Sequence, residues 1–163
     1  IGREVASRAV AFGMKIVAYD PALDESEIKR RGATPVTLSQ ALQKADYLSL
    51  HLPLNEKTRG LIGTEQLSQM KKGSRIICLA RGGIVDEVAL KKALDENHLA
   101  GAALDVFSNE PVEKNSIATH PKVTATPHIG AQTKEAQERA SIAIAEEIVA
   151  ALEDKSLRWQ VKY

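Results

Sequence analysis

Residues 1–21, IGREVASRAVAFGMKIVAYDP, contain the pattern that decides the fold. After Gly2, apolar residues recur at helical spacing until Gly13 ends the run, and residues 15–20 then form an apolar strand that closes on Asp20. This order of glycine, helix, glycine, strand and acidic residue is that of the second half of a dinucleotide-binding βαβ unit. We therefore expect the first strand of the unit and part of its glycine-rich loop to be lacking.

The rest of the chain repeats the alternation of apolar strands with amphipathic helices. Two strands, KIVAYD and SRIICLA, are nearly continuous apolar runs, which is typical of a parallel sheet covered by helices. The sequence therefore predicts an α/β fold with a Rossmann-type, doubly wound parallel sheet. The lacking strand would lie beside residues 15–20 and 75–79. The expected strands are 15–20, 47–51, 75–79, 101–106 and 123–126. The expected helices are 2–12, 26–31, 38–44, 64–70, 86–97 and 133–153, the last of them with Thr133 as its N-cap.

Composition excludes several classes of protein. The 163 residues suit one domain, and 22 Lys and Arg nearly balance 21 Asp and Glu, so neither a nucleic-acid nor a membrane surface is expected. No apolar run approaches the roughly 20 residues of a membrane span. No cluster of residues has metal-ligand spacing, so no metal is expected. The single cysteine, Cys78, lies in an apolar run and is expected to be buried, and a cytoplasmic location is expected.

Polar residues capable of chemistry follow the expected strands. Because open parallel sheets bind ligands at the carboxyl ends of their strands, these residues are expected to share one edge of the sheet, which we call the carboxyl edge. The strand ends carry Asp20, His51, Arg81, Asp105 with Glu110, and His128.

Two of these residues suggest ligand contacts by their chemistry. Asp20 lies 18 residues after Gly2, a spacing that suits a carboxylate accepting hydrogen bonds from an adenosine ribose, and its charge favours NAD over NADP. The alternative for Asp20 is a plain Asp-Pro turn. Arg81 precedes Gly82–Gly83, where the backbone is expected to approach a ligand closely while the guanidinium grips a carboxylate. The alternative for Arg81 is an ordinary surface arginine.

His128 is the candidate for proton transfer. It lies in a short loop between Pro127 and Ile129, and histidine has the pKa range for general acid–base work. Glu110 is the carboxylate expected to hold its ring and stabilise the cationic form. The other three histidines are expected to be structural or solvent-exposed, although His51 is also a candidate for the adenine side of the cleft; they are His51, His98 and His120.

Several longer strings carry a resemblance to a known family. The chain resembles the D-isomer-specific 2-hydroxyacid dehydrogenases over almost its whole length, in the strings IGREVA, FGMKIVAYDP, HLPLNEKTRGLI, MKKGSRIICLARGGIVDE, AGAALDVFSNEP and PHIGAQTKEAQ. The resemblance implies a substrate-binding arginine at Arg81, an acid–base histidine at His128 and its paired glutamate at Glu110. It implies NAD as the cofactor, with contacts from Ile1, Gly2, Asp20, Leu52, Leu79, Ala80, Arg81, Asp105, His128, Ile129, Gly130 and Ala131.

The resemblance also implies an activity and leaves alternatives open. The strings are most similar to family members that oxidise 3-phosphoglycerate for serine synthesis. Hydroxypyruvate/glyoxylate reductases share the three catalytic residues and are the alternative enzyme, and NAD-binding corepressors are the alternative of another class. We expect residues 1–163 to be part of an NAD-binding domain without its substrate domain, in a homo-oligomeric enzyme. Residues 157–163, LRWQVKY, alternate in polarity and are expected to form either a return linker or a strand that fills the gap.

Overall fold

The computed structural model describes residues 1–114 and 116–160. The chain divides into two compact units, Ile1–Pro127 and His128–Tyr163, each with its own structure. The first unit contains all the strands among the described residues, and the second contains a long helix.

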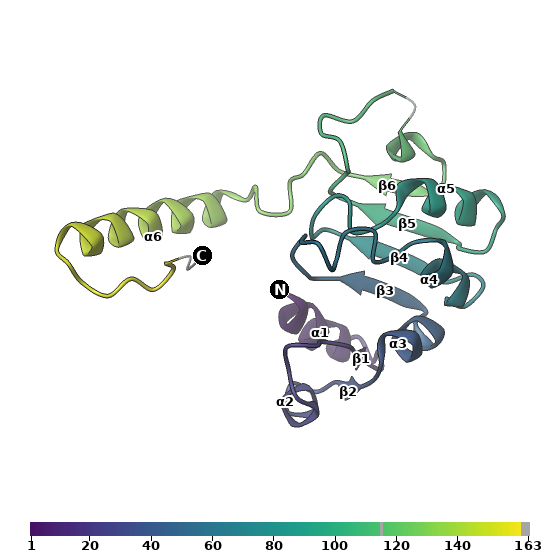
Figure 1. Cartoon of the computed structure of the whole chain (residues 1–163), viewed down its shortest axis with the longest axis horizontal. Helices are drawn as coiled ribbons and strands as arrows, with labels where there is room; N and C mark the ends of the chain where they lie inside the picture. Colours follow the sequence, from purple (N-terminus) through teal and green to yellow (C-terminus); the bar gives the residue numbers. More distant parts are fainter. Residues whose placement is uncertain (115, 161–163) are drawn as a thin grey trace. The chain divides into compact units, whose positions relative to one another are not determined.

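Parallel strands form two sheets in the first unit (Figure 1). The smaller sheet pairs β1 (Val17–Ala18) with β2 (Thr34–Pro35). The larger sheet has the order β3-β4-β5-β6, and all its neighbouring strands are parallel. This parallel α/β arrangement confirms the predicted fold class. The strands of the larger sheet are β3 (Tyr47–Leu50), β4 (Arg75–Cys78), β5 (Gly101–Leu104) and β6 (Val123–Ala125).

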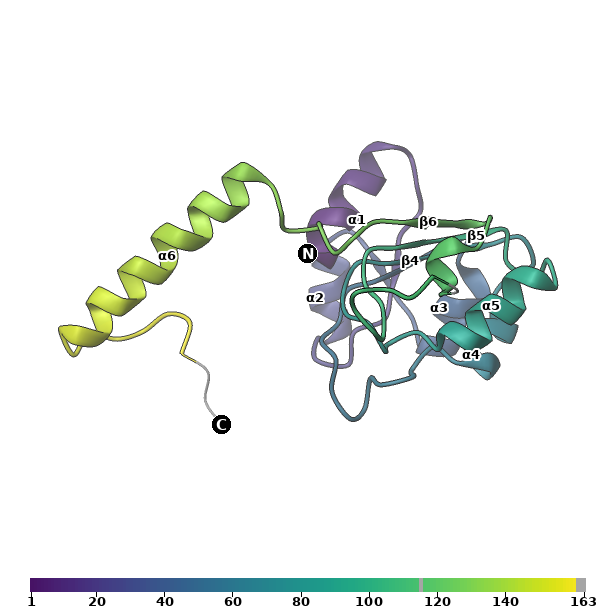
Figure 2. The same ribbon diagram turned by 90° about the horizontal axis from the view of Figure 1, so that it is seen from above.

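Short polar side chains fix where several helices begin. The side chains of Asp24, Thr37 and Asp86 each accept a hydrogen bond from a backbone N–H in the first helical turn. Figures 1 and 2 show the third, fourth and fifth helices together along one face of the larger sheet. The helices of the unit are α1 (Gly2–Ala11), α2 (Glu25–Arg30), α3 (Leu38–Lys44), α4 (Thr64–Gln69), α5 (Glu87–Asp95) and the 3₁₀ helix η1 (Ile117–Thr119).

The hydrophobic core lies between the larger sheet and these helices. In β4, Ile76 and Cys78 are buried, whereas Arg75 is exposed and Ile77 only partly covered, as expected for alternating side chains of a strand. The buried cluster runs from Leu42 to Ile117, and α1 contributes no buried residue. The expected burial of Cys78 is confirmed, at 2% exposure.

The structure corrects four details of the sequence prediction. The strand expected over 15–20 pairs only at Val17–Ala18, and the one expected over 101–106 ends at Leu104. The strand β2 was not predicted, because two residues are too short for a periodic pattern. The expected open edge at 75–79 is also wrong, since β4 pairs with β3 on one side and with β5 on the other. Within the described residues, β3 pairs with β4 alone and β1 with β2 alone.

The second unit is built on α6 (Lys134–Leu152), and Thr133 caps its first turn as predicted. Residues 157–160 do not form a strand, which was one of the two alternatives for residues 157–163. Instead, the N–H groups of Arg158 and Trp159 donate to the Glu147 carboxylate, at 3.0 and 3.3 Å. The remainder of that expected strand, 161–163, lies outside the described residues.

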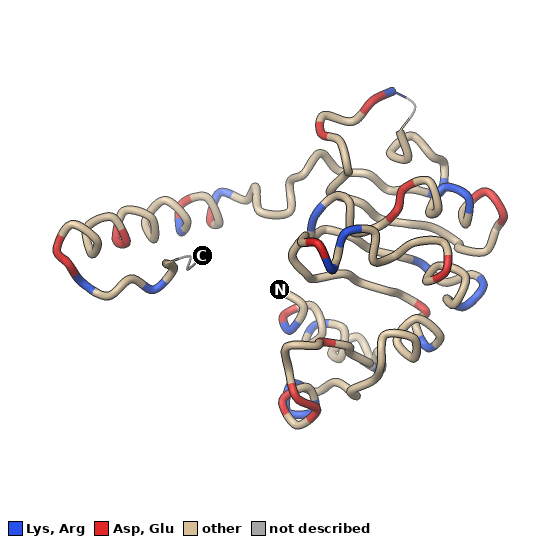
Figure 3. The backbone as a smooth tube through the Cα atoms, viewed as in Figure 1, with Lys and Arg blue, Asp and Glu red and all other residues tan. Residues whose placement is uncertain are grey.

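Charges of both signs are interspersed along the chain (Figure 3). On α2 and α5, for example, Lys29 pairs with Glu25 and Lys91 with Asp95, each one helical turn apart. In the described part of the chain, no helix is long and apolar enough to cross a membrane.

Candidate active site

The expected ligand-binding residues of the first unit do follow its parallel strands. Asp20 follows β1, His51 follows β3, Ala80 and Arg81 follow β4, and Asp105 follows β5. In the larger sheet, Leu50, Cys78 and Leu104 pair across three neighbouring strands, so the residues after them leave at the same carboxyl edge. The register therefore brings the residues around Ala80 and Asp105 together.

The start of α1 lies against the end of β3. A Cβ atom built on Gly2 would come 3.3 Å from the His51 Cβ, a contact so close that a side chain there would require His51 to shift slightly. Ile1, the N-cap residue of α1, makes no side-chain cap, and the first N–H groups of the helix have no partner within the helix. Such a helix start suits an anion such as a pyrophosphate. The pKa of His51 is lowered, mainly because the side chain is partly buried. The His51 Nε2 lies 2.9 Å from Ser49 Oγ.

Asp20 is exposed beyond β1, and its Oδ1 accepts a hydrogen bond from Ala22 N–H at 2.9 Å. The turn that was the alternative interpretation is therefore present. It orients the carboxylate without consuming all its acceptor capacity, because an ionised carboxylate can accept about four hydrogen bonds. The residue fits the ribose contact that was expected of it.

The turn after β4 presents Arg81 and meets the loop after β5. The exposed guanidinium donates from Nη1 to the Ala80 carbonyl at 2.6 Å and retains other N–H donors for a ligand. A Cβ atom on Gly82 would lie 1.8 Å from the carbonyl oxygen of Phe107. The close approach expected of this glycine is therefore to the protein's own backbone. Gly83 adopts a left-handed conformation, with φ of 80°, which glycine tolerates best.

Asp105 is a buried carboxylate at the carboxyl edge. It is 2% exposed, its N–H donates to the Cys78 carbonyl at 3.1 Å, and Thr126 Oγ1 donates to its Oδ1. A carboxyl group buried in this way is stable only with hydrogen-bonding partners. Thr126 was not predicted as part of the site, although its place at the end of β6 could have suggested it.

Glu110 lies in the loop that follows β5. Its Oε1 accepts the Phe107 N–H at 2.9 Å, which closes a tight turn. The neighbouring Ser108 N–H donates to Glu87 Oε1, at 2.6 Å, from the first turn of α5. Sequence reasoning missed Glu87 because the contact joins residues 21 positions apart.

The three apolar cofactor candidates at the ends of β3 and β4 differ in their exposure. Leu52 and Ala80 are partly buried and pack against the core, whereas Leu79 is 46% exposed. Leu79 therefore offers an apolar surface at the end of β4, as a ligand contact requires.

His128 and its neighbours belong to the second unit. His128 adopts a left-handed backbone, with φ of 55°, which is uncommon for a residue other than glycine and recurs at functional sites. Ile129 starts a turn in which its carbonyl accepts the Gln132 N–H at 2.9 Å. Residues 128–131 are exposed, and Ile129 retains 47% of its surface, so Gly130 and Ala131 also lie in an accessible loop.

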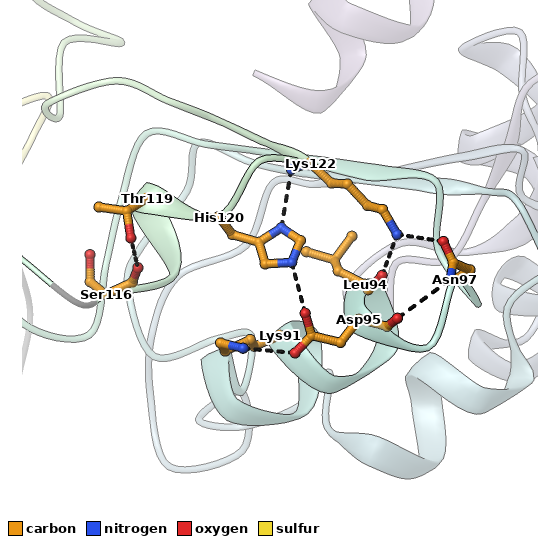
Figure 4. A network of polar contacts seen from close by, with 8 residues as sticks. All are labelled: Lys91, Leu94, Asp95, Asn97, Ser116, Thr119, His120 and Lys122. Carbon is orange, nitrogen blue, oxygen red and sulfur yellow. Dashed lines mark hydrogen bonds and ion pairs between the residues drawn. The ribbon is translucent and has the colours of Figure 1, made fainter.

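The remaining histidines have structural partners, as predicted. His98 Nε2 lies 3.0 Å from the Leu67 carbonyl. Figure 4 shows His120, whose Nδ1 accepts the Lys122 N–H at 3.1 Å, so the Nε2–H donates to Asp95, also at 3.1 Å. Lys91 and His120 together hold the pKa of Asp95 below its ordinary value.

The fold and this edge of the sheet define a dinucleotide-binding domain of the dehydrogenase type. The chain belongs to the family described as "D-isomer specific 2-hydroxyacid dehydrogenase, NAD binding domain", whose model matches residues 1–130. The family identified from the sequence strings is therefore confirmed, and so is NAD as the cofactor that this domain binds.

Similar proteins include enzymes with several substrates. D-3-phosphoglycerate dehydrogenase of Bacillus subtilis (strain 168) is 48% identical over 149 residues, which cover 91% of this chain and 28% of that protein. The crystal structure of a glyoxylate reductase from Paecilomyes thermophila matches with a TM-score of 0.92 and 38% identity, over 99% of this chain and 49% of that one. The NAD-complexed D-isomer specific 2-hydroxyacid dehydrogenase of Lactobacillus delbrueckii ssp. bulgaricus matches with a TM-score of 0.89 and 31% identity, over 99% of this chain and 53% of that one. The chain thus spans less than a third of the curated relative and about half of the two structures.

Proposed function

We propose that the protein carrying this chain is an NAD-dependent D-2-hydroxyacid dehydrogenase that oxidises 3-phosphoglycerate to its 2-oxo acid. The observation that carries the proposal is the contact between Gly82 and Phe107, which packs the turn bearing Arg81 against the loop bearing Glu110. The preference for 3-phosphoglycerate is supported by the 48% identity to the Bacillus subtilis enzyme.

The proposed roles follow from the chemistry of each side chain. The Arg81 guanidinium holds the substrate carboxylate with parallel hydrogen bonds. The His128 imidazole accepts the proton of the substrate hydroxyl, and the Glu110 carboxylate stabilises the imidazolium that forms. These roles require Glu110 and His128 to meet in the working enzyme, which is part of the proposal. When bound, NAD supplies the acceptor for the hydride that leaves the same carbon.

Cofactor binding is assigned to residues whose surroundings fit it. Asp20 accepts hydrogen bonds from the adenosine ribose, and the start of α1 at Ile1 and Gly2 faces the pyrophosphate. Leu52, Leu79 and Ala80 contact the cofactor at the ends of β3 and β4, and Asp105 lies on the nicotinamide side. Ile129, Gly130 and Ala131 complete the proposed set beside His128.

The extent of the domain, the oligomeric state of the enzyme and its location in the cell are also proposals. We infer that residues 1–163 are part of the NAD-binding domain of a longer enzyme, whose substrate domain lies elsewhere in the polypeptide, and that this enzyme is a homo-oligomer. The coverage of 28% of the Bacillus subtilis protein supports the first inference. A cytoplasmic location belongs to the same proposal.

Steady-state kinetics of the full-length protein would test the substrate assignment. We expect a higher kcat/KM for 3-phosphoglycerate than for glycerate with NAD. The opposite order would favour a hydroxypyruvate or glyoxylate reductase, the alternative that the glyoxylate reductase structure supports.

The role of His128 has its own test. Exchanging His128 for alanine should lower kcat on the order of 10²–10⁴-fold, the usual contribution of a general acid–base group. Arg81→Ala should also raise KM, because it removes a contact made in the ground state. If His128→Ala leaves kcat within a factor of about three, the assignment of proton transfer is wrong.

A further inference from the structure

The peptide group between Phe107 and Ser108 is contacted from two sides, and the N–H just before it has a partner of its own. The backbone of Gly82 lies against it so closely that a Cβ atom would be 1.8 Å from its oxygen and 2.9 Å from its nitrogen. Its N–H, that of Ser108, donates to Glu87 Oε1 at 2.6 Å. The preceding N–H, that of Phe107, donates to Glu110 Oε1 at 2.9 Å. One peptide group therefore joins the turn after β4, the loop after β5 and the start of α5.

Glu87 lies at a rigid position from which it can hold the Phe107–Ser108 peptide, where the three segments meet. It is the first residue of α5, and Asp86 already caps the helix by accepting the N–H groups of Val88 and Ala89, at 2.9 and 3.0 Å. The carboxylate of Glu87 is thus not needed as the cap and is available to the loop. The segment before it is anchored, because Val85 bridges to Ile62 and Asp86 N–H donates to the Ile62 carbonyl at 3.0 Å.

The Phe107–Ser108 peptide lies between the segments that carry Arg81 and Glu110, two residues with proposed roles in catalysis. Arg81 directly precedes Gly82, and Glu110 closes the turn that begins at Phe107. Phe107 is buried, whereas Ser108 and Glu110 are exposed, so the outer part of the loop depends on its hydrogen bonds more than on packing. A misplacement of about 1 Å at a catalytic group can cost on the order of 100-fold in rate.

We propose that Glu87 is a positioning residue, whose carboxylate anchors the Ser108 amide and thereby fixes Glu110 relative to Arg81. The proposal rests on the proposed function for its effect on catalysis, but the anchoring itself does not depend on that function. Glu87 touches neither substrate nor cofactor in this scheme and acts only through the 107–110 loop.

The test compares Glu87→Ala and Glu87→Gln in the full-length enzyme, with Glu65→Ala as the matched control. Glu65 is an exposed glutamate in the first turn of α4, so its removal also takes a negative charge from a helix N-terminus. We expect Glu87→Ala to lower kcat on the order of 10-fold with the Kd for NADH within about twofold of wild type. Glu87→Gln keeps an oxygen that can accept the Ser108 N–H and should restore most of that loss. Glu65→Ala should match wild type.

A double variant shows whether the effect passes through Glu110. If Glu87 acts by placing Glu110, then Glu87→Ala should add almost nothing to the loss caused by Glu110→Gln. Losses that multiply in the double variant, or an unchanged kcat in Glu87→Ala, would overturn the positioning role.

Hydrogen–deuterium exchange separates this proposal from the proposed function. Exchange of the Ser108 amide should be about tenfold faster in Glu87→Ala than in wild type or Glu65→Ala, because a hydrogen bond to a charged acceptor is lost. Unchanged exchange would refute the anchoring, whatever the enzyme's substrate. The two results can also differ. If the wild-type protein has no D-2-hydroxyacid dehydrogenase activity but Ser108 exchanges faster in Glu87→Ala, the proposed function is refuted and the anchoring is not.

Discussion

Replacement of Gly82 by alanine tests how tightly the two loops of the candidate site are joined. The new methyl group would lie 1.8 Å from the Phe107 carbonyl oxygen and 2.2 Å from its carbon. To reach an ordinary contact, the Phe107–Ser108 peptide would have to move by more than about 1 Å, against the hydrogen bonds that the Ser108 and Phe107 N–H groups donate to Glu87 and Glu110. Overpacking typically costs 1–3 kcal/mol, and here the obstacle is backbone, so we expect a loss of about 3 kcal/mol or more in the free energy of unfolding.

Gly73→Ala is the matched control for this substitution. Gly73 has φ of 82° and no atom within 4 Å of the Cβ position, so alanine there meets backbone strain without a clash. That strain should cost about 1–2 kcal/mol. Urea denaturation followed by far-UV circular dichroism would give both values, and the melting temperature should fall by about 6–12 °C for Gly82→Ala. A loss no larger than that of Gly73→Ala would refute the close contact.

Three further predictions follow from other parts of the structure. Replacing Asp20 with a small neutral residue, together with a nearby arginine, should raise kcat/KM with NADP relative to NAD; a wild-type protein that already prefers NADP would contradict this. Burial lowers the pKa of His51, so its stabilising contribution should be complete above its ordinary pKa of about 6.5 and should be lost as the pH falls below that value. Urea midpoints at pH 8 and pH 5.5 should therefore differ less in His51→Gln than in wild type. Burial also raises the pKa of the Cys78 thiol, so a disulfide reagent should label it only after denaturation, and rapid labelling of the native protein would disprove its burial.

Local signals in the sequence predicted the helices well. The helix at 38–44 was predicted at its observed bounds from its amphipathic pattern. The structure adds the reason for its start, because Thr37 accepts the N–H of Gln40 and the Gln40 side chain accepts the N–H of Thr37. Thr133 likewise caps α6 where a cap was expected. Strand ends were predicted less well, because apolar residues such as Leu79 and Val106 continue beyond the last ladder hydrogen bond.

The chemistry of the carboxyl edge was predictable, but its internal contacts were not. Strand alternation was enough to place Asp20, Arg81 and Asp105 at or near the carboxyl ends of strands. The bond from Ser108 to Glu87 and the approach of Gly82 to Phe107 join backbone segments over 20 residues apart. Such contacts depend on how two loops pack, and no short sequence pattern encodes them.

The uneven distribution of the core gives the first unit a gradient of local stability. No side chain of α1 is buried, and β1 and β2 share only two residue pairs, whereas the buried cluster begins at Leu42. Segments with few buried contacts open at a small fraction of the global unfolding free energy. Residues 1–36 should therefore exchange their amide hydrogens long before β4 does. A ligand that contacts both Asp20 and Arg81 would bind only when residues 1–36 are folded. Its binding energy would therefore suppress the local unfolding of these residues, and α1 would unfold together with the rest of the unit.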